Sequence, residues 1–180
     1  MSEQQQKLID GCKRGEPKSQ KSLYDAYAGK MMAVCMRYCG NDRDTAMDLL
    51  QDGFIKVFTY IGSYDGRGSL EGWIRRIVIN VALDYVRTSD LLKNAESIEA
   101  INETSVENID SSTIDKLSAE ELMEIIGELP SGFRTVFNLF AIEGYSHKEI
   151  AEMLNITEST SRSQLTRAKQ LLQKRLKDFI

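Results

Sequence analysis

Hydrophobic residues recur at every third or fourth position along most of the chain, which is the spacing of amphipathic helices. One such stretch covers residues 19–39, and a second covers residues 44–59 after a turn at residues 40–43. A third covers residues 71–87. Strand-like alternation is scarce, and the 180 residues include only two prolines. The pattern therefore predicts an all-α protein.

The same spacing predicts which side chains face a core. They are Leu23, Tyr24, Tyr27, Met31, Val34, Cys35 and Tyr38 in residues 19–39; Ala46, Leu49, Leu50, Phe54, Val57 and Phe58 in residues 44–59; and Trp73, Ile77 and Val81 in residues 71–87. The second helix keeps Asp48, Gln51, Asp52 and Lys56 on its outer face. A polar face of this kind is usually solvated surface, but it also suits docking of a basic or amide-bearing helix from a partner.

Residues 61–69 form a loop with three glycines, one tyrosine and one arginine. No strand precedes the loop and no Walker lysine pattern is present, which argues against binding of a nucleoside triphosphate. The helix that follows carries Trp73 together with Arg75, Arg76 and Asn80. Aromatic rings can stack on bases while arginines hold the phosphate backbone, so this region suits single-stranded DNA.

Two segments lack helical periodicity. Residues 1–18 are polar and only weakly helical, with breaks at Gly11, Gly15 and Pro17. Residues 89–117 are rich in Asn, Ser and Glu, which predicts a flexible linker. Residues 89–128 contain eleven acidic and two basic side chains, a net charge of −9, so the rest of the chain must carry +5 to give the total of −4. The acidic segment thus masks a basic remainder that is compatible with nucleic-acid binding.

The C-terminal part is predicted to contain four helices. Ser118 and Glu121 have the spacing of a capping box, and the helix that they begin has an apolar face made of Leu122, Ile125, Ile126 and Leu129. Residues 130–133 break this helix. A short helix is then predicted over residues 134–142, with Val136, Phe137 and Phe140 turned inward.

The last two predicted helices lie in residues 144–177 and are joined by a tight turn. Ser146 and Glu149 form a second capping box, Asn155 lies where the turn needs a left-handed residue, and Thr157 can cap the final helix. The inward positions are Ile150, Ala151, Leu154, Leu165, Ala168 and Leu172. The outer face of the final helix carries Arg162, Ser163, Gln164, Thr166 and Arg167.

Residues 158–177 contain six basic side chains and one acidic side chain. The outer-face residues are of the types that read base edges and hold phosphates. The pattern therefore predicts a helix-turn-helix that binds DNA. The alternative is an amphipathic helical hairpin whose basic face is simply solvated.

Three cysteines and one histidine give little support for a metal site. Cys35 and Cys39 share a helix face, but His147 is distant in the sequence, so buried thiols in a reducing compartment are the better interpretation. No metal or cofactor is expected. The polar N-terminus does not have the pattern of a signal peptide, and no apolar run is long enough to span a membrane, so a cytoplasmic protein is expected.

Taken together, the motifs resemble the extracytoplasmic-function (ECF) sigma factors, a two-domain group within the sigma-70 family of bacterial transcription-initiation subunits. Residues 48–58 resemble the helix of that family that binds core RNA polymerase, and residues 68–87 resemble its segment for promoter melting and minus-ten recognition. Residues 129–137 and the helix-turn-helix resemble the fourth sigma domain. The resemblance covers residues 19–177.

The resemblance implies a role for each group of residues. The face that docks on the clamp of the polymerase's largest subunit would be formed by Asp48, Leu49, Gln51, Asp52, Phe54 and Phe58. The melted minus-ten strand would be received by Ser63, Tyr64, Arg67, Ser69, Arg75, Arg76 and Asn80, with Tyr64 as a stacking surface for a flipped base. The minus-35 duplex would be read by Arg162, Ser163, Gln164, Thr166 and Arg167.

The same resemblance divides the chain into a polar segment (1–18), sigma domain 2 (19–88), an acidic linker (89–117) that passes toward the RNA exit channel, and sigma domain 4 (118–180). The partners implied are the clamp and flap regions of core polymerase, double- and single-stranded promoter DNA, and an anti-sigma factor; the chain itself would not insert into a membrane. Two positions depart from the commonest family pattern. Arg87 is not followed by further basic residues, and Gln164 replaces a frequent arginine, which would favour adenine over guanine.

Two other classes of protein share a terminal helix-turn-helix. A response-regulator type of transcription factor needs alternating strands and helices before it, whereas this chain is predicted to be helical throughout. A site-specific recombinase needs a nucleophile among clustered arginines, and neither Ser69 nor Tyr85 has such surroundings. The sequence therefore favours a sigma factor, which is not itself an enzyme.

Overall fold

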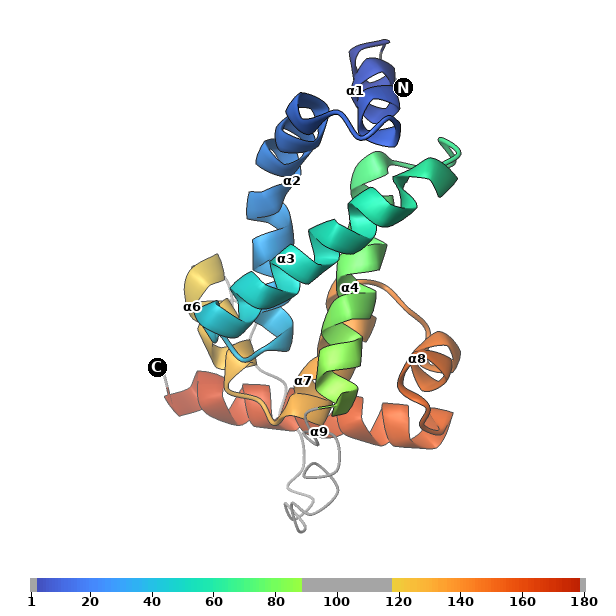
Figure 1. The fold of residues 1–180 in the computed structure, drawn as a ribbon. Helices are drawn as coiled ribbons and strands as arrows, with labels where there is room; N and C mark the ends of the chain where they lie inside the picture. Colours follow the sequence, from blue (N-terminus) through green and yellow to red (C-terminus); the bar gives the residue numbers. More distant parts are fainter. Residues whose placement is uncertain (1–2, 89–117, 179–180) are drawn as a thin grey trace. The chain divides into compact units, whose positions relative to one another are not determined.

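The computed structural model describes residues 3–88 and 118–178, and these two ranges contain helices but no strand (Figure 1). Their contacts group into two compact units. Among the described residues, one unit comprises residues 3–36 and 42–85, and the other comprises residues 37–41, 86–88 and 118–178. The predicted all-α class is confirmed. The predicted linker, residues 89–117, lies outside the described residues.

The first unit is built from four α-helices and one turn of 3-10 helix. In chain order these are α1 (Glu3–Lys13), α2 (Pro17–Tyr38), α3 (Arg43–Tyr60), η1 (Ile61–Ser63) and α4 (Leu70–Thr88). The last two residues of α2 and the last three of α4 group with the second unit. Helix α3 begins at an N-cap, Asp42, whose side-chain oxygen accepts hydrogen bonds from Asp44 N at 3.1 Å and Thr45 N at 3.4 Å. This cap satisfies backbone donors that the first helical turn leaves open.

The core of the first unit lies among α2, α3 and α4. Gly53 allows α3 to approach α4 closely, because a β-carbon at this position would lie 3.0 Å from Val78 Cγ2. The predicted inner faces of α2 and α3 are largely confirmed, although Tyr24 is 36% exposed. The fully buried or nearly buried core residues include Leu23, Met31, Val34, Ala46, Leu50, Phe54, Val57, Ile74 and Val78.

The predicted apolar stripe of α4 is partly wrong. Val81 is buried as expected, but Trp73 and Ile77 are only half-buried, and Ile74 and Val78 take the central positions. Helix α4 buries apolar side chains around much of its circumference. A single stripe of period 3.6 therefore does not describe it.

The N-terminal segment is more structured than predicted. Helix α1 covers most of residues 1–18, and its Ile9 and Cys12 are 1% and 2% exposed. Gly11 fits tightly against the start of α2, because a β-carbon there would lie 2.1 Å from Ser19 Oγ. Helix α1 is therefore part of the packed unit rather than a polar extension.

The second unit contains α6 (Ala119–Gly127), α7 (Ser131–Phe137), the π-helix η3 (Asn138–Ile142), α8 (His147–Leu154) and α9 (Glu158–Asp178). Helix α9 contacts α6, α7 and α8 and extends along the base of this unit (Figure 1). One buried cluster joins α6 and α7 to α9; it consists of Ile125, Ile126, Leu129, Phe133, Ala168, Leu172 and Leu176.

The helix boundaries predicted within residues 118–142 are confirmed in part. The capping box of α6 is present, since Glu121 N donates to Ser118 Oγ at 3.2 Å and Ser118 N donates to Glu121 Oε2 at 2.8 Å. The next helix begins at Ser131 rather than Arg134 and becomes a π-helix at Asn138. Phe140 is 36% exposed instead of facing the core.

The cysteines follow the prediction of buried thiols at two positions: Cys12 and Cys35 are buried, while Cys39 is half-buried. Burial raises the pKa of the Cys12 thiol, and the negative charge of Glu16 raises it further. In the described ranges, no helix is long and apolar enough to cross a membrane. Those ranges also contain no group of three or more potential metal ligands.

Candidate functional site

Helix α3 presents a polar outer face above aromatic packing. Asp48, Gln51 and Asp52 are exposed, as predicted. The apolar members of the predicted set lie beneath them: Leu49 and Phe54 are 5% and 3% exposed, and Phe58 is half-buried. The exposed side chains can make direct contact with a partner, whereas the buried ones shape the face from below.

Two large apolar residues on the same helix were not predicted to contribute. Ile55 is 63% exposed and Met47 is 46% exposed. They lie four residues on either side of Gln51, so the three side chains form a row along α3. Both residues fall outside the apolar positions that face the core, and this mismatch in the sequence could have revealed them. The face therefore combines carboxylates with an exposed apolar row.

An aromatic cluster supports this face. The Phe54 ring lies 4.7 Å from Tyr24 of α2 and 6.0 Å from Phe58, measured between ring centroids. Tilted aromatic pairs at these separations are favourable beyond the area they bury. The cluster therefore fixes α3 against α2.

The glycine-containing loop after η1 is folded around Tyr64. This residue is 5% exposed, its hydroxyl donates to Gly68 O at 3.1 Å, and its ring centroid lies 5.5 Å from that of Trp73. Gly66 and Gly68 have φ values of +81° and +75°, which glycine adopts without steric cost. The expectation that Tyr64 offers an open stacking surface is therefore corrected: its ring fills the inside of the loop.

The other predicted loop residues are exposed and hydrogen-bonded locally. Ser63 Oγ donates to Tyr60 O at 2.7 Å, and Ser69 Oγ accepts from Gly72 N at 3.0 Å, which caps the start of α4. Arg67 has a side chain that is 92% exposed and an Nε atom 3.3 Å from Asp65. An ion pair this exposed contributes little, so Arg67 can exchange Asp65 for a phosphate.

Helix α4 leads away from the loop with polar residues on its surface. Arg76 and Asn80 are exposed one turn apart, and Arg75 is half-buried. A spacing of four residues places Arg76 and Asn80 on the same helix face. These two residues belong to the same unit as the exposed loop residues.

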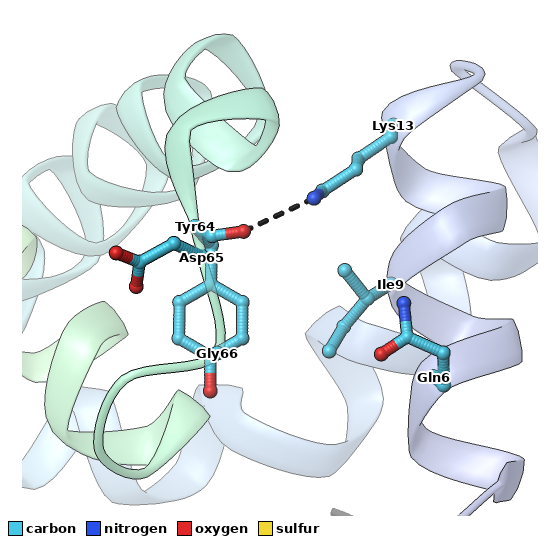
Figure 2. Close-up of a pocket in the computed structure, with 6 residues that line it drawn as sticks. All are labelled: Gln6, Ile9, Lys13, Tyr64, Asp65 and Gly66. Atoms are coloured by element: carbon cyan, nitrogen blue, oxygen red, sulfur yellow. Dashed lines mark hydrogen bonds between the residues drawn. The ribbon is translucent and has the colours of Figure 1, made fainter.

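Helix α1 closes the other side of the loop, which the sequence did not indicate. Lys13 Nζ donates to Tyr64 O at 3.0 Å (Figure 2). A cavity of about 140 Å³ lies beside this bond, and its lining comes from α1 and the loop: Gln6, Ile9, Lys13, Tyr64, Asp65 and Gly66. The N-terminal helix is therefore attached to the predicted strand-binding loop.

The helix-turn-helix is present as predicted. The α8 capping box joins Ser146 and Glu149, with Glu149 N donating to Ser146 Oγ at 3.3 Å. Asn155 adopts the left-handed conformation, with φ 54° and ψ 46°. Thr157 Oγ1 accepts from Thr160 N at 3.0 Å and so caps α9. The turn chemistry of this region was therefore predicted correctly.

Four of the five predicted residues on α9 are exposed: Arg162, Ser163, Thr166 and Arg167. Arg162 is paired with Glu158, one turn earlier, at 2.5 Å. The fifth residue, Gln164, is only 7% exposed and its Oε1 has no hydrogen-bond partner among the described residues. Its placement on the outer face was wrong, so a direct contact between Gln164 and adenine has no support in this conformation.

His147 joins the two helices of the helix-turn-helix and was not predicted as a functional residue. Its Nδ1 lies 2.9 Å from Oγ of the fully buried Ser161, and its ring stacks on Phe140 at a centroid distance of 4.5 Å. Burial lowers the His147 pKa, the positive charges of Arg162 and Lys169 lower it further, and Glu158 opposes them. The neutral ring therefore links α8 to α9.

Comparison with known proteins assigns both units. The family described as "Sigma-70 region 2" matches residues 23–91, and "Sigma-70, region 4" matches residues 119–172. The chain is 30% identical over 182 residues to the ECF RNA polymerase sigma factor SigW of Bacillus subtilis, with 96% of this chain and 97% of that protein covered. The chain belongs to the ECF sigma factors of the sigma-70 family.

This ECF sigma factor has further relatives at similar distance. It is 27% identical to the ECF RNA polymerase sigma-E factor of Haemophilus influenzae, with 97% of this chain and 96% of that protein covered. Its fold is similar to that of the sigma factor RpoE from Bartonella quintana, solved in complex with the anti-sigma factor NepR. That comparison has a TM-score of 0.53 and 20% identity and covers 87% of this chain and 96% of the other.

Membership of the family establishes the general role. The protein is an alternative sigma factor, which acts in transcription initiation with RNA polymerase and promoter DNA. The family comprises transcription factors rather than a known class of enzyme. The exposed faces of α3, α4 and α9 are therefore candidates for its polymerase and DNA contacts.

Proposed function

We propose that this sigma factor uses three separate surfaces to start transcription. The outer face of α3 docks on the clamp of core polymerase, the loop and α4 hold the melted minus-ten strand, and α9 reads the minus-35 duplex. The observation that carries this proposal is the exposed row Arg162, Ser163, Thr166 and Arg167 on the second helix of a helix-turn-helix. A helix of this type can enter the major groove.

The α3 face has the mixture of groups that suits a protein partner. Ile55 and Met47 can bury apolar area on binding, while Asp48 and Asp52 select a partner of complementary charge. Apolar residues at the centre of an interface usually supply much of its affinity. Docking on core polymerase therefore accounts for the exposed apolar residues as well as for the carboxylates.

The minus-ten surface offers positive charge and an exposed loop. Arg67 lies in this loop and Arg76 lies on α4, and both are exposed. The loop contains two left-handed glycines, which have no side chain to cover the backbone. The loop between Ser63 and Ser69 accepts an unstacked base, and the arginines hold the neighbouring phosphates. Since Tyr64 is buried, the half-buried Trp73 is the better candidate for a stacking contact.

Connection of the two units in one chain lets weak separate contacts act together. Each DNA contact raises the effective concentration of the other. Sequence-specific binding therefore needs both promoter elements in the same fragment. An anti-sigma factor is a further expected partner, as the Bartonella quintana relative was solved with one.

The direct test is run-off transcription on a genomic promoter library with bacterial core polymerase, with and without this protein. Protein-dependent transcripts that share two upstream sequence motifs would support the proposal and identify the promoter. Core polymerase alone is the control. Specific duplex binding without core polymerase, together with no protein-dependent transcript, would instead favour a helix-turn-helix regulator and overturn the proposal.

A further inference from the structure

The glycine-containing loop is attached to helix α1, whose Lys13 lies 51 positions before Tyr64 in the sequence. Lys13 Nζ donates to Tyr64 O at 3.0 Å, and the two residues lie on facing sides of the cavity in Figure 2. Ile9, on the preceding turn of α1, is 1% exposed and lines the same cavity. Helix α1 thus contributes one hydrogen bond and one apolar contact surface to the loop.

The loop needs such an attachment because its own backbone is permissive. Gly66 and Gly68 both have positive φ values, and residues 65–69 are exposed. Within the loop, Tyr64 Oη donates to Gly68 O and Arg67 N donates to Asp65 Oδ1 at 2.9 Å. These bonds fold the loop on itself, whereas the bond from Lys13 fixes it relative to the helices.

The cavity beside Lys13 makes this bond more important. Its volume of about 140 Å³ is below the roughly 300–1,000 Å³ of pockets that bind cofactors and similar ligands. It is better explained as incomplete packing between α1 and the loop. Where packing is incomplete, fewer dispersion contacts hold the loop, so the hydrogen bond supplies a larger share of the attachment.

The base of α1 is itself fixed. Gly11 packs against α2, and Glu16 N donates to Gly11 O at 3.0 Å across the connection. Arg14 Nε and Glu16 Oε1 form an ion pair at 2.8 Å, but both side chains are largely exposed, so this pair adds little. Lys13 lies between these residues, so the backbone from which its ammonium group reaches the loop is held at the junction of α1 and α2.

We propose that Lys13 is a positioning residue for strand capture. By bonding to the Tyr64 carbonyl, it holds residues 64–69 in the conformation that accepts the melted minus-ten strand. This inference rests on the proposed role of the loop in capturing that strand. It assigns a function to α1, and this function is distinct from that of the side chains that contact DNA.

Three variants of the full-length protein test the inference. Lys13→Met removes the donor and keeps most of the side-chain length, and Lys13→Arg retains a cationic donor. Lys7→Met is the matched control, because Lys7 lies on the same helix and its side chain is 75% exposed. Lys7 forms an ion pair with Glu3 at 2.7 Å. Hydrogen exchange of the loop amides is measured first, since it does not depend on the promoter sequence.

The second measurement is binding of single-stranded oligonucleotides by the sigma factor with core polymerase. The probe carries the non-template minus-ten sequence obtained from the run-off transcripts, and a scrambled oligonucleotide serves as the control. We expect Lys13→Met to speed loop-amide exchange and to weaken binding of the specific probe, each by about three- to tenfold, as for the loss of one hydrogen bond. Lys13→Arg and Lys7→Met should retain wild-type behaviour, and binding to core polymerase should be unchanged.

Each other outcome has a definite meaning. Unchanged exchange in Lys13→Met would show that the bond does not hold the loop and would overturn the inference. Faster exchange with unchanged probe affinity would also overturn it, while leaving strand capture intact. If the wild-type complex did not distinguish the two probes, strand capture itself would be refuted, and the positioning role would fall with it.

Discussion

Asn155 gives the most direct test of how this sequence builds its helix-turn-helix. The residue holds φ 54° and ψ 46°, and Ile156 N donates to Ala151 O at 3.1 Å across the turn. Left-handed backbone costs roughly 1–2 kcal/mol for an ordinary L-residue, less for asparagine, and almost nothing for glycine. Asn155→Ala should therefore destabilise the second unit by about 1 kcal/mol, and Asn155→Gly should leave it unchanged or slightly more stable.

The position of the single tryptophan allows a clean assay. Trp73 lies in the first unit, so its fluorescence follows that unit, while far-UV circular dichroism follows both. In thermal unfolding, 1 kcal/mol corresponds to about 4–8 °C for a domain of this size. The Asn155→Ala shift should be seen in the dichroism and be absent from the Trp73 fluorescence. Glu152→Ala, on the exposed face of α8, is the control and should change stability by less than about 0.5 kcal/mol.

Alanine and glycine variants that are both as stable as the wild type would refute this reasoning. Such a result would mean that residue 155 is not held in the left-handed region in solution, or that the turn relaxes without cost. A loss in both variants of similar size would point instead to a side-chain contact of Asn155. The decisive result is therefore the order of stability, which should decrease from glycine to asparagine to alanine at residue 155. The unfolding midpoint of a single variant does not decide the question.

Three further predictions concern the proposed surfaces. Arg167→Ala should weaken binding to the upstream hexamer by about 1–3 kcal/mol; an unchanged footprint over that hexamer would remove Arg167 from the interface. Asp52→Lys should weaken binding to core polymerase by at least about tenfold without unfolding the protein, while Asp25→Lys, on α2, should not; equal pull-down by both variants would contradict the α3 assignment. For His147, burial holds the pKa below its ordinary value in the folded state, so the unfolded chain binds the proton more readily. Stability of the second unit should be full above about pH 6.5 and fall as pH drops toward the lowered pKa, and His147→Gln should abolish that part of the pH dependence in thermal unfolding.

Local hydrogen-bonding signals made part of the fold predictable. Ser118 and Ser146 each precede a glutamate by three residues, and both form the predicted capping boxes. Asn155 was recognised because few residue types tolerate its conformation. In these cases the interaction lies within one helical turn, so the sequence contains all the participants.

The predictions that were wrong concern residues whose burial depends on parts of the chain that are distant in the sequence. Gln164 lies three positions after Ser161 and four before Ala168, both fully buried, so it flanks the inner face of α9 although its polarity suggested the outer one. Helix α1 has few apolar residues, and Ile9 and Cys12 are buried because the helix packs against later parts of the chain, η1 among them. Ile55 shows the reverse case, because an apolar side chain was left exposed by the packing of its helix.

The π-helix η3 amounts to one additional residue within a helical turn. Glu143 N donates to Asn138 O at 2.9 Å, a bond that spans five residues instead of four. That bond closes with five residues the turn that four residues close in an α-helix, so the extra residue is accommodated and the chain on either side stays in phase. Deleting one residue from this segment would therefore restore ordinary α-helical bonding and leave the entry into α8 nearly unchanged. Deleting one residue from an ordinary α-helix would instead rotate the chain that follows by about 100°, since an α-helix has 3.6 residues per turn. The segment just before the helix-turn-helix of this sigma factor is thus a place where the chain length can change by one residue without turning any side chain that faces DNA.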